Sequence, residues 1–212
     1  MSTVDVDSVE RIDGRRARGE RSRRSILEAA AVLASVEGLE GLSLNRLASH
    51  LGISKGGLYA HFDSKEQLQV ETVRAAAEMY GRDVMAKAVE APPGIGQVLA
   101  FADTFLEYVK DGPFPGGCFF VASFLDPANL RGPVRQALAE VQRGLLDFFA
   151  ENIRIAQDAG DLPTDLDPEE TAFEIDAILV GADVNYVLFD DPKRLENARL
   201  AVRRLLGADP GS

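Results

Sequence analysis

Cysteine, histidine and tryptophan are scarce in this chain, and their scarcity excludes several classes of site. The single cysteine, Cys118, cannot form a disulfide within the chain and suits a reducing compartment. The only histidines, His50 and His61, lie far from it in sequence, so we expect no metal site. Since there is also no nucleophile-elbow serine and no phosphate-binding loop, we expect neither enzymatic activity nor a cofactor.

Long apolar segments are also absent. The longest stretch without a charged residue, 112–125, is too short to cross a bilayer and is interrupted by prolines and glycines. The first ten residues are acidic and contain no apolar core of the kind that a secretory signal needs. We therefore expect a cytoplasmic protein that does not associate with membranes.

Positive charge is scarce overall but concentrated in one segment. The formal net charge is −11. Residues 11–65 nevertheless hold ten Lys or Arg against six Asp or Glu, a balance of +4, whereas residues 66–212 hold thirteen against twenty-five, a balance of −12. Such a basic head on an acidic body can direct nucleic acid to one end of the molecule. Without a motif beside it, an accident of surface composition explains the asymmetry as well.

Residues 43–65 contain such a motif, SLNRLASHLGISKGGLYAHFDSK. Apolar residues recur at helical spacing over 44–51, which predicts a first short helix that ends at Gly52. Ser54 then stands at the N-cap position of a second helix. The apolar anchors of that second helix are Leu58 and Phe62. Two short helices joined by a tight turn, the second with an outward polar face, are typical of a helix-turn-helix.

Helical patterns cover most of the remaining chain, and no segment alternates like a strand, so the expected fold class is all-α. A first helix is expected from about Ser22 to Glu37, and a long helix from Ser64 to about Val89. Further helices are expected near 95–110, 117–125, 132–158, 168–190 and 193–206.

Two N-terminal segments carry a family resemblance, RRSILEAAAVLASVEG and LSLNRLASHLGISKGGLYAHFDSKEQL. On these residues the chain resembles the TetR family of transcriptional repressors. From residue 69 on, the match is limited to length, helical content and acidity. The resemblance implies a flexible arginine-rich arm (1–20), a helix-turn-helix DNA-binding domain (21–65) and a helical-bundle ligand-binding and dimerisation domain (66–212).

Each DNA contact that we predict has a physical reason. Lys55 can neutralise a phosphate at the start of the recognition helix, and Gly56 and Gly57 let the backbone approach the groove closely. The resemblance implies that Tyr59 contacts phosphate through its hydroxyl. The predicted DNA-binding residues are Ser43, Asn45, Arg46, Ser54, Lys55, Gly56, Gly57, Tyr59, His61 and Lys65.

Structural alternatives exist for several of these residues. Tyr59 also fits a tyrosine at the edge of a core, and His61 a packing histidine. Arg46 also fits a solvated surface charge, since helix faces routinely carry one. The arginine-rich arm can be disordered without touching DNA, or it can enter the minor groove.

Aromatic side chains are dense from Phe101 to Phe124, which suits a cavity for a small apolar or aromatic ligand. A packed core of the same composition is the alternative. Asp183, Asn185 and Tyr186, in the apolar helix expected over 168–190, can anchor a ligand there or be satisfied at a subunit interface. The predicted ligand-binding residues are Phe101, Phe105, Tyr108, Cys118, Phe120, Phe124, Asp183 and Tyr186.

Cys118 and the last two helices complete the prediction. A helix N-terminus favours a thiolate sensor at Cys118, whereas its apolar neighbours favour an inert buried thiol. Segments 168–190 and 193–206 carry apolar residues on more than one face, so they must be buried on two sides. By the resemblance, these two helices pair with their twofold mates in a homodimer that binds a palindromic site.

We therefore interpret the chain as a repressor that binds double-stranded DNA at a palindromic operator and is released by a small-molecule effector. A helical ligand-binding or partner-binding protein with a vestigial DNA-binding head is the alternative. It predicts no salt-dependent affinity for DNA.

Overall fold

The computed structural model describes residues 6–126 and 131–208, and within these ranges the chain is helical without any strand. The all-α prediction is therefore confirmed for the described residues. The helices are α1 (Val6–Glu37), α2 (Leu44–Leu51), α3 (Lys55–Tyr59), α4 (Lys65–Tyr80), the π-helical η1 (Gly81–Met85), α5 (Ala86–Ala88), α6 (Ile95–Asp111), α7 (Phe119–Leu125), α8 (Gly132–Ala159), α9 (Pro168–Phe189) and α10 (Lys193–Leu205).

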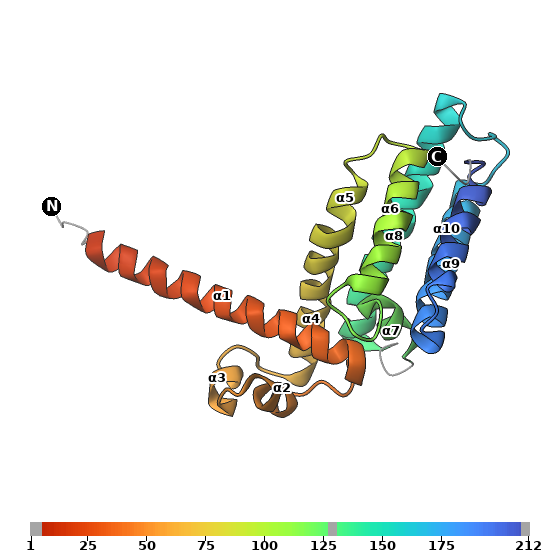
Figure 1. Ribbon diagram of the computed structural model, residues 1–212. Coiled ribbons are helices and arrows are strands. Elements are labelled where there is room, and N and C mark those ends of the chain that lie inside the picture. The colour runs from red at the N-terminus through yellow and green to blue at the C-terminus, as the bar shows by residue number, and fades with distance from the viewer. Residues whose placement is uncertain (1–5, 127–130, 209–212) are drawn as a thin grey trace.

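The head consists of the C-terminal part of α1 together with α2 and α3, at the bottom of Figure 1. Its helix ends follow from local chemistry. The Ser43 side chain accepts a hydrogen bond from the Arg46 N–H at the start of α2, and Gly52 ends α2 with a φ of 66°. Ser64 caps α4 in the same way by accepting from the Gln67 N–H. The predicted end of the first short helix at Gly52 is thus confirmed.

Helix α1 begins much earlier than predicted. The structure continues it to Val6, so residues 6–20 belong to a helix, whereas the expected first helix began at about Ser22. Figure 1 shows this N-terminal half projecting away from the rest of the molecule. Residues 1–5 of the predicted arm lie outside the described residues. The early start of α1 was not predicted because charged residues without an apolar stripe carry no periodic signal, although they are compatible with a helix.

The long helix after the head is continuous, as predicted, but it changes its winding halfway. Helix α4 passes into the π-helical segment η1 and then α5, ending before Pro92 and Pro93. Figure 1 shows the three segments rising together from the head along the body. A π-helical insertion widens one turn, and such turns are frequent at functional sites.

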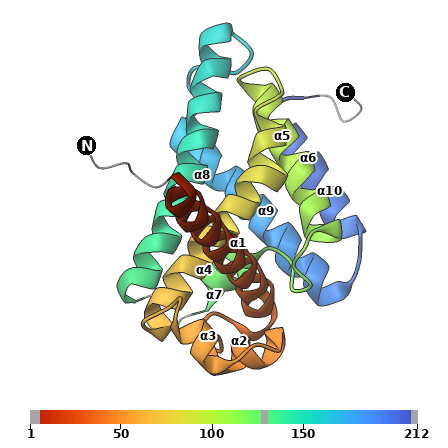
Figure 2. The same cartoon turned by 90° about the vertical axis from the view of Figure 1, so that its left-hand side faces the viewer.

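The body is a bundle in which α8 packs along α9, α9 along α10, and α6 lies against α8, α9 and α10. The predicted segments match these helices closely. Figure 2 shows α4, α8 and α9 crossing behind α1. Buried apolar side chains form one continuous cluster from the head to the end of α10. Because α1 packs on both α4 and α7, head and body share that core.

Candidate functional site

The recognition helix α3 is short and is fixed to the head from one side only. Leu58 is fully buried and Phe62 is 1% exposed, as predicted for its two apolar anchors. The Ser54 side chain accepts a hydrogen bond from the Gly57 N–H at 3.2 Å and so caps the helix. The opposite side is open, because Lys55, Gly56 and Gly57 are exposed and Tyr59 is 54% exposed. Tyr59 is therefore not a core-edge tyrosine in this structure.

Among the described residues, none requires glycine at position 56. Its φ is not positive, and a Cβ there would meet no atom within 4 Å. A Cβ at Gly57 would meet only the Ser54 hydroxyl oxygen, at 3.4 Å. Two consecutive glycines weaken a helix by about 1 kcal/mol each relative to alanine. Neither backbone conformation nor packing of the described residues therefore explains the glycine pair.

Two of the predicted DNA-binding cations are engaged within the head. The Arg46 guanidinium donates to both carboxylate oxygens of Glu37, and this hydrogen bonding is the main reason why the pKa of Glu37 is lowered. Lys65 Nζ donates to Glu40 at its carbonyl oxygen (2.7 Å) and at Oε1 (2.6 Å). Both side chains keep much of their surface open, 60% for Arg46 and 42% for Lys65. Phosphate would have to compete with these carboxylates.

The remaining predicted contacts differ in exposure. Asn45 is exposed on α2, Ser43 is half-buried at its cap, and His61 is half-buried after α3. The His61 carbonyl oxygen accepts a hydrogen bond from Arg23, whose guanidinium also lies 4.6 Å from the centre of the Phe62 ring. Arg23 thus holds the end of α3 in place, a role that sequence reasoning did not find because its partner is distant along the chain.

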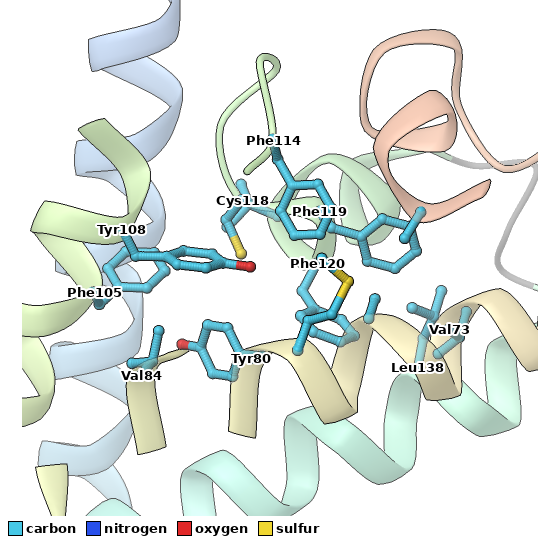
Figure 3. Close-up of a cluster of buried hydrophobic side chains, with 14 of the residues drawn as sticks. Val73, Tyr80, Val84, Phe105, Tyr108, Phe114, Cys118, Phe119, Phe120 and Leu138 are labelled. Carbon is cyan, nitrogen blue, oxygen red and sulfur yellow. The ribbon is translucent and has the colours of Figure 1, made fainter. Parts of the chain in front are cut away.

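A cavity of about 280 Å³ lies inside the body between α4, η1, α6, α7, α8 and α9. Five of the eight predicted ligand-binding residues line it: Phe101, Phe105, Cys118, Phe120 and Phe124. The wall also contains residues that the sequence did not single out, among them Tyr80, Met85, Gln142 and Asp176. Tyr80 stands edge-on to the Phe105 and Phe120 rings, with centroids 6.4 Å and 5.7 Å away. Figure 3 shows these rings grouped with Cys118 between α4 and α6.

The other three predicted residues do not line this cavity. Tyr108 instead lines an open, charged cleft of about 750 Å³ beside α10. Asp183 is 2% exposed and accepts a hydrogen bond from the Cys118 backbone N–H at 3.0 Å. Tyr186 is half-buried against the core. These three residues lie outside this cavity wall because helical spacing alone did not separate the sides of α6 and α9 that face the cavity from their other sides.

Cys118 has the character of an inert thiol. It is 2% exposed, and burial raises its pKa to about 12, with the Asp183 charge acting in the same direction. A thiol with so high a pKa is almost entirely protonated at neutral pH and is a poor nucleophile. The buried-thiol alternative is thus the one that the structure favours. Within the described residues, no group of histidine, cysteine and acidic side chains could hold a metal ion.

The loop between α6 and α7 is fitted tightly between the head and α9. A Cβ at Gly116 would collide with the Ser35 carbonyl oxygen of α1, and one at Gly117 would collide with Asp183. Gly117 also has a φ of 85°, which side chains rarely adopt. The loop therefore connects the end of α1, the cavity wall at Cys118 and helix α9.

Helix α9 has an unpartnered apolar side. Phe173 is 65% exposed, Val184 37% and Leu188 70%, at spacings that put them on one face. Ile175 and Leu179, on the opposite face, are buried in the core. A helix that is apolar on two sides normally has a second partner. In the part of the chain that the structure describes, no helix is long and apolar enough to cross a membrane.

Fold and site together define a class of protein. A short capped helix projects its polar side from a basic helix-turn-helix head, and an all-helical body behind it encloses an apolar cavity. This is the organisation of a helix-turn-helix transcriptional regulator with a separate regulatory domain.

Comparison with known proteins identifies the family. Residues 26–72 match the family described as bacterial regulatory proteins, tetR family, and residues 94–202 match the tetracyclin repressor-like C-terminal domain. The second match alone spans half of the chain. The protein therefore belongs to the TetR family of transcriptional regulators, which is not a family of enzymes.

Individual relatives agree with this assignment. An uncharacterized HTH-type transcriptional regulator of Mycobacterium tuberculosis is 30% identical over 96 residues, 45% of this chain and 48% of that protein. The chain thus spans about half the length of such curated relatives. A TetR transcriptional regulator from Chloroflexus aurantiacus has the same fold, with a TM-score of 0.81 and 24% identity over 90% of this chain and 95% of its own. AibR, solved with isovaleryl coenzyme A and operator DNA, gives a TM-score of 0.68 and 22% identity over 88% and 99% of the two chains.

Proposed function

We propose that the protein is a cytoplasmic, homodimeric repressor that binds a palindromic operator and leaves it when a small molecule occupies the body cavity. The observation that carries the proposal is the one-sided anchoring of α3. Leu58 and Phe62 fix the helix to the core, while Lys55 and Tyr59 face outward. Family membership and the basic charge of residues 11–65 support it.

Most of the contacts that we propose go to the phosphate backbone. Lys55 and the N–H groups at the start of α3 would hold one phosphate, and the Tyr59 hydroxyl would hold a second. The glycine pair would let the α3 backbone enter the major groove closely. Base reading would then rest mainly on Asn45 and Arg46 of α2. Ser43, Ser54, His61 and Lys65 complete the proposed interface.

The proposed dimer forms through α9 and α10. The exposed apolar face of α9, centred on Val184, is the surface that a second copy would cover. A twofold axis there would present two α3 helices about one DNA turn apart, as a palindromic site requires. AibR, which shares this fold, is known with operator DNA.

Two connections support coupling between cavity and head. Tyr80, Gly81 and Met85 line the cavity and lie on the continuous helix that starts at Lys65 in the head. Cys118, on the opposite wall, follows the loop that packs against the end of α1. A ligand that fits the cavity better in one arrangement of the two heads would shift the protein towards it, and only by that difference in affinity.

A gel-shift experiment with the DNA upstream of the protein's own gene tests the proposal. We expect a retarded complex whose affinity falls steeply as salt is raised, since phosphate contacts release counterions. Random DNA of the same length and composition is the control. A protein that binds neither DNA would favour the alternative of a vestigial head, and one that binds both DNAs equally would contradict a sequence-specific repressor.

A further inference from the structure

The charged side chains that line the body cavity are all acidic. Two acidic residues line it, Glu140 on α8 and Asp176 on α9, and its wall contains no lysine, arginine or histidine. An anionic ligand would therefore meet two carboxylates and no cation. This is the cavity of the proposed function, and a regulatory role for a ligand bound there rests on that proposed function.

Asp176 is a carboxylate without a positive partner. It is half-buried, and Gln142 Nε2 donates a hydrogen bond to its Oδ2 at 2.8 Å. Among the described residues, no lysine, arginine or histidine forms an ion pair with it. Burial raises its pKa, and the Gln142 hydrogen bond opposes that rise. A cation placed next to this carboxylate would compensate for the lost hydration.

Aromatic rings cover much of the remaining wall. Tyr80 and four phenylalanines line the cavity, and the Tyr80 ring stands nearly perpendicular to the Phe120 ring, at 79°. The faces of such rings carry negative partial charge and attract organic cations. Groups of aromatic side chains around a carboxylate are well suited to ammonium groups, because the rings exclude water without neutralising the charge.

From this combination we propose that the effector is a compact organic cation, an amine or quaternary ammonium compound with an apolar or aromatic body. Its nitrogen lies at Asp176, and its apolar part packs among the rings of Tyr80, Phe101, Phe105 and Phe120. The volume of about 280 Å³ is at the lower end for small-molecule sites, which limits the ligand to a compact molecule. The acidic body, with its balance of −12 over residues 66–212, attracts the same class of ligand.

Calorimetric titration of the purified full-length protein with three probes tests the inference. The probes are 3-phenylpropylamine, 3-phenylpropan-1-ol and 3-phenylpropionate, which share a ring and a chain but differ in charge. We expect the amine to bind about tenfold more tightly than the alcohol, and the carboxylate not to bind detectably. An alcohol that binds as tightly as the amine, a carboxylate that binds more tightly, or an amine that does not bind at millimolar concentration would overturn the proposal.

The variant Asp176→Asn tests whether this carboxylate causes the preference for the amine over the alcohol. Its side-chain oxygen can still accept from Gln142, so we expect it to fold, which thermal melting would verify. The affinity for the amine should fall about tenfold, to that for the alcohol, while the affinity for the alcohol stays the same. Asp147→Asn, which removes one exposed charge of α8 away from the cavity, is the matched control and should change neither. Equal behaviour of the two variants would contradict the role of Asp176.

The two proposals fail in distinguishable ways. DNA binding is measured without any amine, so its loss speaks against the proposed repressor and leaves the cavity titrations unaffected. An absence of amine selectivity in a protein that does bind its operator speaks only against the proposed ligand class.

Discussion

At the scale of single residues, the most informative position is Gly56. Sequence reasoning attributes the glycine pair to a close approach of DNA, and the structure removes the internal alternatives, since a Cβ at Gly56 would meet nothing and its φ is not positive. Caps were equally predictable, because Ser43, Ser54 and Ser64 act on N–H groups three residues away. Arg23 was not predictable, because its partner His61 is distant in sequence.

Gly56→Ala should separate stability from DNA binding. Alanine suits a helix better than glycine by about 1 kcal/mol, so the free energy of unfolding should stay equal or rise. If the backbone of α3 lies against the groove, the added methyl group should weaken operator binding by about tenfold or more. Denaturant unfolding and fluorescence anisotropy with labelled operator measure the two effects. Unchanged operator affinity would show that the glycine pair does not serve the DNA contact.

Titration of the buried Asp183 carboxyl should change the free energy of unfolding of the protein. Desolvation by burial raises its pKa from 3.8 to about 6, against the opposing hydrogen bond from the Cys118 N–H. The folded state therefore holds this proton more tightly than the unfolded state. The contribution of Asp183 to the free energy of unfolding is therefore fully present below the pKa of this carboxyl in the unfolded state. It is lost as the pH rises through the folded-state pKa of about 6.

Asp183→Asn isolates this contribution, because asparagine can still accept from the Cys118 N–H but does not titrate. The unfolding free energy of the natural protein should fall relative to that of the variant by about 1 kcal/mol between about pH 5.5 and 8. Urea unfolding at matched protein concentration measures this difference. A constant difference across that range would show that Asp183 titrates as an ordinary exposed carboxyl, and a change of opposite sign would contradict its raised pKa.

At the scale of elements, periodicity and caps were enough to find nearly every helix of the body. The spacing of apolar residues over 132–158, for example, corresponds to α8 (Gly132–Ala159), and Gly160 ends it with a φ of 82°. Two helical features were not predicted from the sequence. The start of α1 has no apolar stripe to mark it, and η1 has no distinctive sequence, since a π-helical turn differs from an α-helical one only in its hydrogen bonding.

Helix α9 gives the element-scale prediction. Leu188→Glu places a charge on its exposed apolar face and should convert the proposed dimer into monomers at micromolar concentration, because an unpaired charge would be buried in the proposed interface. The affinity for the operator should fall when the monomers form, since two linked heads bind a palindrome far more tightly than one. Light scattering measures the mass. The control is Leu125→Glu, which changes a leucine of α7 that is 60% exposed and should leave the mass that of the natural protein.

At the scale of the whole molecule, the charge map agrees with the fold. The basic segment 11–65 covers the helix-turn-helix head, and the acidic remainder forms the bundle behind it. The cavity could be anticipated only in part. Aromatic density pointed to α6 and α7, but the wall also takes residues from α4, η1, α8 and α9, such as Asp176. Which side of each helix faces inward depends on packing between elements far apart in sequence.

Binding of operator DNA by matched head variants tests the central claim most directly. Fluorescence anisotropy would compare the natural protein with Lys55→Ala and Tyr59→Phe over a series of salt concentrations, after thermal melting has shown that all three are folded. Both variants should bind more weakly, and Lys55→Ala should also lower the salt dependence by about one unit per recognition helix. Operator affinity unchanged in both variants at every salt concentration would contradict the assignment of α3 as the DNA-contacting element.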